Sequence, residues 1–128
     1  MTTARVLTLM GSGETAPTMI KTHRALLARF EHPTAVLLDT PYGFQENAPE
    51  LAQRAVDYFR RSVGTEIEVA GLHQVNRADP VALGRGLAAL RSADYVFAGP
   101  GSPTYSLREW TGSEVPRLLR DKLRNGGA

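Results

Sequence analysis

Residues 35–64 read AVLLDTPYGFQENAPELAQRAVDYFRRSVG and predict one complete strand–loop–helix unit. The unit opens on four consecutive apolar residues, 35–38, which is typical of a strand buried on both faces. Asn47 is expected to cap the following helix in a capping box with Glu50, and Pro49 lies in the first turn, where a missing N–H costs nothing. Gly64 is expected to end that helix. The segment therefore indicates a parallel α/β fold.

The same alternation extends in both directions from this unit. Strands are expected at residues 6–10, 66–72 and 95–98, the 66–72 strand near an edge because it alternates polar and apolar residues. Helices are expected at about residues 17–30, from Asp79 with Val81, Leu83, Leu87 and Leu90 inward, and from a cap at Ser113 to Gly126. We therefore predict one domain, residues 1–128, with an open, mostly parallel sheet flanked by helices.

Composition excludes several classes of protein. The chain has 128 residues, 42% of them hydrophobic and 22% charged, which excludes disorder, collagen and coiled coil for the whole chain. A formal charge of +2 gives no reason to expect nucleic acid or a membrane as a partner. No cysteine is present, so nothing indicates an oxidising compartment, and we expect a cytoplasmic protein.

The last residues read as a helix that turns into a further strand. Residues 125–128, Asn-Gly-Gly-Ala, are typical of a helix end. In a βα series a helix returns the chain to another parallel strand, so we expect the domain to be incomplete at its C-terminus, after a fourth βα unit. The apolar surface left open is expected to be covered by a second copy of the chain or by another partner chain.

The predicted loops after the first, second and fourth strands should share one rim of the sheet, because ligands of open parallel sheets bind beyond the carboxyl ends of the strands. Polar groups and glycines are frequent in these loops, although such residues also make ordinary turns. The candidate ligand-binding residues on the first two loops are Ser12, Glu14, Tyr42 and Gln45. On the last loop, backbone N–H groups of Gly99, Gly101 and Ser102 could stabilise an oxyanion.

A nucleotide-binding module is an alternative. Residues 11–16, Gly-Ser-Gly-Glu-Thr-Ala, match the G-x-G-x-x-A pattern of dinucleotide folds, and Asp39 ends the second strand where a ribose-binding acid would lie. A helix that begins at Pro17 would leave a wide loop in place of a tight phosphate cradle. His23, His32 and His73 have no partner at metal-ligand spacing, so no metal site and no cofactor are expected, and His23 is predicted to be a core or boundary residue.

Two glycine-rich segments carry a family resemblance. Residues 6–14, Val-Leu-Thr-Leu-Met-Gly-Ser-Gly-Glu, and residues 93–102, Ala-Asp-Tyr-Val-Phe-Ala-Gly-Pro-Gly-Ser, together with a helix ending in Gly-Gly-Ala, resemble the N-terminal half of the aspartyl dipeptidase and cyanophycinase family. That family has a fold similar to class I glutamine amidotransferases, a flavodoxin-like three-layer sandwich. The resemblance implies a serine peptidase-type hydrolase acting on a small peptide or amide, with residues 99–102 beside the oxyanion site. Pro100 and Ser102 depart from the family's usual Gly-Gly-x-Asn or Gly-Gly-x-Gln.

The resemblance also implies what this chain lacks. In such proteins a nucleophile elbow, Gly-x-Ser-Ala-Gly, follows on the next strand, with the histidine and acid later still. We therefore expect no catalytic residue among residues 1–128 and a chain that is inactive alone. A third reading is a structural half that needs a partner chain.

Overall fold

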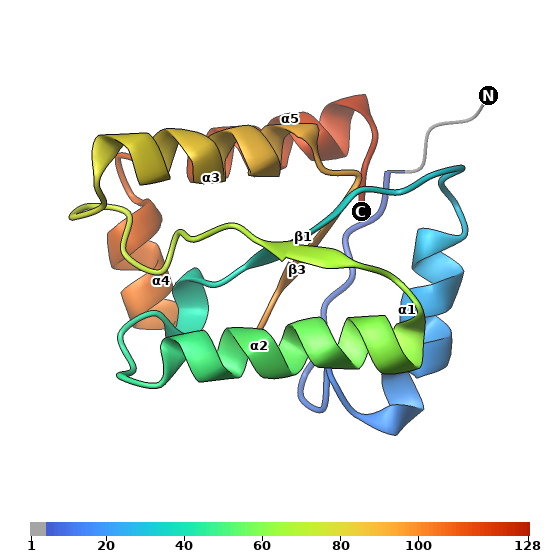
Figure 1. Ribbon diagram of the computed structural model, residues 1–128. Coiled ribbons are helices and arrows are strands. Elements are labelled where there is room, and N and C mark those ends of the chain that lie inside the picture. Colours follow the sequence, from blue (N-terminus) through green and yellow to red (C-terminus); the bar gives the residue numbers. More distant parts are fainter. Residues whose placement is uncertain (1–4) are drawn as a thin grey trace.

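The computed structural model describes residues 5–128 and consists of three short strands and five α-helices (Figure 1). The elements are, in order, α1 (Ile20–Leu27), β1 (Ala35–Leu38), α2 (Ala48–Tyr58), β2 (Ile67–Val69), α3 (Pro80–Ser92), β3 (Tyr95–Ala98), α4 (Pro103–Trp110) and α5 (Val115–Asn125). Short 3₁₀ turns at Pro17–Met19 and Thr40–Tyr42 precede α1 and follow β1. A π-helical turn, Phe59–Val63, extends α2 to Gly64, whose left-handed conformation ends the helix as predicted.

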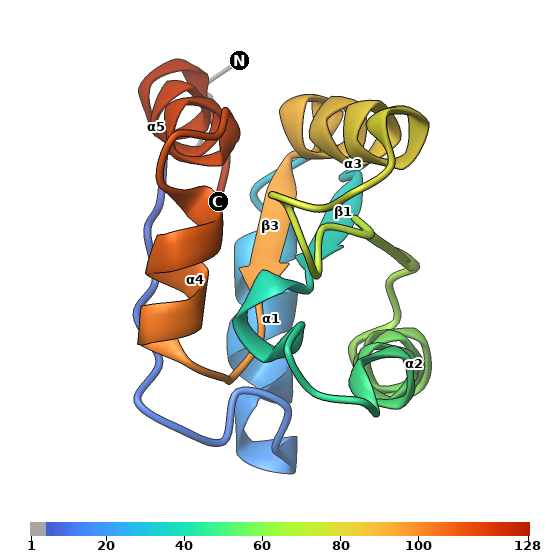
Figure 2. The same cartoon turned by 90° about the vertical axis from the view of Figure 1, so that its left-hand side faces the viewer.

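The three strands form one parallel sheet in the order β2-β1-β3. β1 is the central strand, and Ala35 lies opposite Ile67 on one side and Tyr95 on the other. Helices α1 and α2 lie on one face of the sheet, and α3 and α5 lie on the other (Figures 1 and 2). This arrangement confirms the predicted open parallel sheet flanked by helices, with β2 at an edge.

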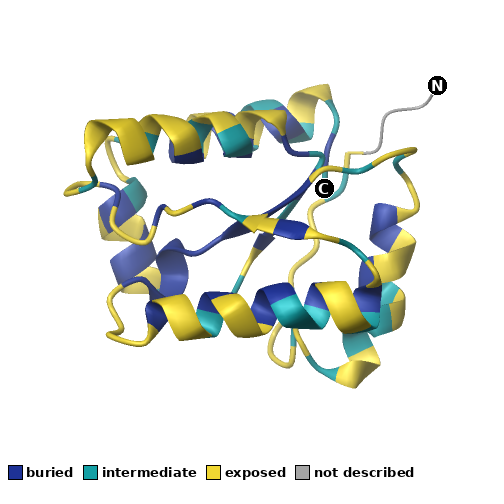
Figure 3. Ribbon diagram, in the orientation of Figure 1, coloured by how far each residue is buried: buried dark blue, intermediate teal, exposed yellow. Residues whose placement is uncertain are grey.

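Burial follows from the central position of β1. All four of its residues are buried, and alternate side chains enter two separate cores (Figure 3). Ala35 and Leu37 pack with α1 and α2, whereas Val36 and Leu38 pack with side chains of α3 and α5. A strand that serves two cores has no polar face, which is why its sequence is continuously apolar.

Local signals at the helix starts had mixed outcomes. Asp79 caps α3 as predicted, its carboxylate accepting the Ala82 N–H at 3.2 Å. Asn47 makes no side-chain cap of α2, although Pro49 occupies the first turn as predicted. Ser113 accepts the Val115 N–H at 3.2 Å, near the start of α5. Val81 was expected to face inward and is 69% exposed, because it lies in the first turn of α3, beyond the sheet that α3 covers.

Residues 6–10 are a correction to the prediction of a first strand. The structure places Arg5 in an isolated parallel bridge with Gly127, and the Val6 N–H donates to the Gly127 carbonyl at 3.0 Å, but residues 6–10 form no strand. Leu7 and Leu9 are 69% and 86% exposed. A strand exists through its ladder of hydrogen bonds, and β3 does not extend its ladder to this segment. The sheet therefore has three strands where four were predicted.

Helix α4 was not anticipated as a separate element. Ser102 caps it, its hydroxyl accepting the Tyr105 N–H at 3.0 Å, and Pro103 begins its first turn. Within residues 5–128, none of the helices is both long and apolar enough to span a bilayer.

Candidate functional site

The loops that follow β1 and β3 touch each other at the carboxyl ends of these strands. The Ser102 N–H donates to the Pro41 carbonyl at 2.8 Å. A Cβ atom on Gly101 would lie 1.9 Å from the same carbonyl oxygen, and one on Gly99 would lie 3.1 Å from the Tyr42 ring. Only glycine allows backbone to approach so closely at position 101. The structure therefore brings three of the sequence-predicted residues, Tyr42, Gly99 and Gly101, to one place.

The other candidates occupy different surroundings. Ser102 uses its N–H on Pro41 and its hydroxyl on the α4 cap. Glu14 lies across the rim, where its carbonyl accepts from the His23 ring at 2.7 Å. Ser12 and Gln45 are exposed and line neither of the cavities described next.

Two cavities meet at this rim. The larger, about 620 Å³, lies beside β3 and residues 6–10, and Glu14 is part of its lining. The smaller, about 380 Å³, lies over the start of α2. Gly99 and Pro100 line both, so the loop after β3 separates two hollows whose volumes lie in the range of small-ligand sites.

Sequence reasoning missed two residues of the smaller cavity. Arg54 and Tyr58 of α2 line it together with Tyr42. Arg54 was interpreted as a solvent-facing partner of Glu50, which it does contact at 3.2 Å, and Tyr58 as part of an apolar stripe. The available signal was their spacing, because residues 51, 54, 55 and 58 share one helix face and all four line the cavity.

The Tyr42 hydroxyl is the polar group at this site that lacks a partner. Its oxygen is buried and makes no hydrogen bond among residues 5–128. Burial raises the pKa of Tyr42 above the ordinary phenol value, and the nearby Asp39 carboxylate raises it further. The hydroxyl therefore stays protonated at all physiological pH values and retains an unused donor.

Asp39 organises the neighbouring loop. Its buried carboxylate accepts the Leu72 N–H at 2.8 Å, and His73 Nδ1 lies 3.9 Å from its other oxygen. Burial raises the pKa of Asp39, and the Leu72 hydrogen bond and the His73 ring oppose this rise. The carboxylate is thus committed to the segment after β2, which leaves it badly placed for the ribose contact considered in the sequence analysis.

The raised pKa of Asp39 gives a pH prediction. A carboxyl whose pKa is higher in the folded state than in the unfolded state stabilises the fold below its unfolded pKa, and this stabilisation is lost as pH rises through the folded pKa. We therefore expect the free energy of unfolding of the wild type to increase relative to Asp39→Asn as pH falls from 7 towards and below about 4. Urea unfolding of both proteins across this range measures the difference. A wild type that loses stability relative to Asp39→Asn on acidification would contradict the prediction.

His23 ties the first loop to the sheet. It is fully buried, as a core residue was predicted to be, with Nδ1 at 2.7 Å from the Tyr95 hydroxyl and Nε2 at 2.7 Å from the Glu14 carbonyl. A carbonyl only accepts, so Nε2 carries a proton, and in the neutral ring Nδ1 accepts from Tyr95. Burial raises the pKa of Tyr95 to about 12, which keeps that hydroxyl a donor.

The glycine-rich loop at residues 11–16 does not form a phosphate cradle. A 3₁₀ turn follows at Pro17–Met19, and α1 begins at Ile20. A dinucleotide site needs a helix N-terminus at the second glycine, Gly13. Across residues 5–128, His, Asp and Glu side chains form no group of three that could hold a metal ion.

The comparisons with known proteins add one similarity of fold. No family model and no curated protein sequence matches the chain. The crystal structure of a peptidase from an acI-B1 Actinobacterium superposes with a TM-score of 0.75 at 19% sequence identity. The alignment covers 92% of this chain and 49% of the peptidase, so this chain spans about half of that protein's length. The chain therefore has a peptidase-like fold.

Proposed function

We propose that this chain is the N-terminal part of a serine hydrolase similar to aspartyl dipeptidases and cyanophycinases, and that it carries the oxyanion and substrate loops without the nucleophile. The observation that carries the proposal is the meeting of the loops after β1 and β3 beside two cavities, in a fold shared with a peptidase. Cytoplasmic localisation and a small peptide or amide substrate belong to the same proposal.

The rim has the groups that recognise a peptide carbonyl. Backbone at Gly99 and Gly101 can approach a ligand closely, as an oxyanion site requires. The protonated Tyr42 hydroxyl offers a further donor, and the exposed Arg54 guanidinium, at the wall of the smaller cavity, offers a partner for a carboxylate. This set of groups favours a small acidic peptide as the ligand.

Residues 1–128 contain no Gly-x-Ser-x-Gly sequence. An oxyanion pocket without a nucleophile binds a carbonyl group but forms no acyl-enzyme. The 128-residue chain is therefore proposed to bind substrate without turning it over.

Titration with an aspartyl dipeptide, followed by amide chemical shifts, tests the binding. We expect shifts at Tyr42, Gly99 and Gly101, and Tyr42→Phe should weaken binding about fivefold, since a neutral hydrogen bond contributes about 1 kcal/mol. Tyr105→Phe is the matched control because the Tyr105 hydroxyl already donates to the His73 carbonyl at 2.7 Å. Equal weakening by both variants, or no shifts at the rim, would contradict the assignment of the substrate loops.

Two further measurements separate the alternatives. A fluorophosphonate probe is expected to leave the 128-residue chain unlabelled, and covalent labelling would show that it has a reactive serine after all. Titration with NAD under the same conditions addresses the nucleotide-binding module. Micromolar NAD binding without dipeptide binding would favour that module over the hydrolase.

A further inference from the structure

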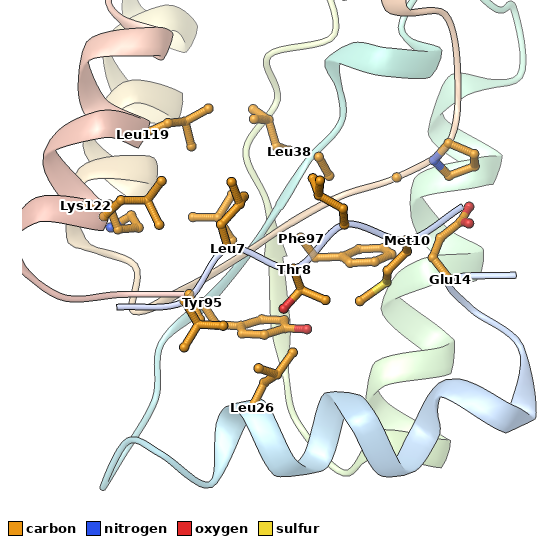
Figure 4. A pocket seen from close by; sticks show the side chains of 18 of the residues that line it. Leu7, Thr8, Met10, Glu14, Leu26, Leu38, Tyr95, Phe97, Leu119 and Lys122 are labelled. Atoms are coloured by element: carbon orange, nitrogen blue, oxygen red, sulfur yellow. The ribbon is translucent and has the colours of Figure 1, made fainter. Parts of the chain in front are cut away.

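The larger cavity is an apolar groove along the free side of β3. Figure 4 shows side chains from residues 6–10, β3, α1 and α5 converging on it. We call it the β3 groove. Its apolar walls include Leu7, Met10, Leu26, Phe97, Leu119 and Leu123.

The chain already enters one end of the β3 groove in strand conformation. The Ala128 N–H donates to the Asp94 carbonyl at 2.8 Å, and the Ala128 carbonyl accepts the Val96 N–H at 2.8 Å. These two bonds flank Tyr95, which is the pattern of a residue paired in parallel. On the other side, Gly127 is bridged in parallel to Arg5. Residues 127 and 128 therefore lie between β3 and the N-terminal segment, with a partner on each side.

Backbone donors continue along both walls of the groove. Because N–H groups alternate in direction along a strand, that of Ala98 faces the same side as that of Val96. The same alternation gives the Thr8 N–H the direction of the Val6 N–H, which donates to Gly127. A strand running on from Ala128 would meet both donors at successive positions. The groove is thus bordered by the two halves of an open parallel ladder.

The walls define the chemistry of the occupant. One face of the groove is closed by Leu26 of α1 and the other by Leu119 of α5, so an inserted strand would be apolar on both faces. The Lys122 ammonium also borders the groove, but it donates to the Arg91 and Ala93 carbonyls and is occupied there. The Trp110 indole Nε1, buried and without a partner in the described part of the chain, is a donor that a strand carbonyl could accept.

We propose that the β3 groove is the docking site of an apolar β-strand that continues directly from Ala128, parallel to β3 and between β3 and residues 6–10. The direction of residues 127 and 128 favours a covalently continuous strand over a second copy of the chain. Its far end would emerge beside Gly99 at the rim. The proposal rests on the sheet geometry and is independent of the proposed hydrolase function.

The test adds a strand of about five residues, Val-Ile-Val-Val-Ser, after Ala128, enough to span the groove at about 3.3 Å per residue. We expect hydrogen exchange at the Thr8 and Ala98 amides to slow at least about tenfold and the melting temperature to rise by about 5 °C or more. The control extension has proline as its second residue, which cannot donate to a ladder. It should produce neither change.

A second variant keeps the result interpretable if the extension alters solubility. Thr8→Pro lies in an exposed segment outside the sheet and should leave the 128-residue chain as stable as the wild type, while reducing the gain from the extension. Equal protection by both extensions would overturn the proposal. So would sedimentation showing the 128-residue chain to be a dimer in which the Thr8 and Ala98 amides are already protected. Failure of dipeptide binding at the rim would leave these exchange results unaffected, so the two proposals fail separately.

Discussion

Gly101→Ala is expected to lower the free energy of unfolding by about 3 kcal/mol or more, a large part of the roughly 5–15 kcal/mol of a typical domain. A Cβ at this position would lie 1.9 Å from the Pro41 carbonyl oxygen and 2.8 Å from the Tyr42 nitrogen. Both atoms are backbone, so no side chain can rotate away to relieve the overlap. The loops after β1 and β3 must separate, which also removes the bond from Ser102 to Pro41. Urea unfolding measures the loss.

Gly112→Ala is the matched control for this variant. Gly112 also has a positive φ, +79°, but a Cβ there would meet no heavy atom within 4 Å. The control therefore reports backbone strain alone, about 1 kcal/mol. Similar losses for the two variants would show that the rim loops are not in the close contact described above. A specific loss at position 101 should be accompanied by amide shift changes at Tyr42.

His23→Leu is expected to cost about 3 kcal/mol, although leucine preserves the apolar volume of the site. The substitution leaves the buried Tyr95 hydroxyl without its acceptor and the Glu14 carbonyl without its donor. Each such group costs about 1–3 kcal/mol when buried without a partner. The aromatic packing of His23 on Phe59, with ring centroids 4.9 Å apart, is lost as well. Thermal and urea unfolding both measure the change.

A double-mutant cycle with Tyr95→Phe identifies the source of this cost. Tyr95→Phe removes the hydroxyl that His23→Leu would strand, so the double variant should be more stable than the sum of the single losses predicts, by about 1 kcal/mol. Strict additivity would mean that the hydrogen bond between His23 and Tyr95 contributes nothing. The same variants should increase exchange at the amides of residues 11–15, because Glu14 anchors that loop to the ring.

The parts of the fold that the sequence predicted are those with local signals. Ala35–Leu38 is continuously apolar because two cores flank it, and Asp79 followed by Pro80 marks a helix start whatever the surroundings. Residues 6–10 show the limit of such reasoning. Their apolar pattern is that of a strand, but strand formation depends on a neighbouring ladder, and no local pattern reports whether that neighbour is present.

The candidate site was predictable in place and less so in detail. The rule that loops meet at the carboxyl ends of parallel strands correctly brought Tyr42, Gly99 and Gly101 together. Arg54 and Tyr58 were missed because their helix position gave them other roles, as a surface ion pair and a packing residue. Ser12 and Gln45 lie outside both cavities, since a polar residue in a loop carries no information about how far the loop reaches.

The central position of β1 has a consequence for synthesis in the cell. Ala35 pairs with Tyr95, so about 60 more residues must leave the ribosome before β1 has both neighbours. At about 5–20 residues per second this takes roughly 3–12 s, during which four consecutive apolar residues lack their final partners. Chaperones that bind short hydrophobic segments of nascent chains should therefore recognise residues 35–38 first, and release them once β3 has emerged.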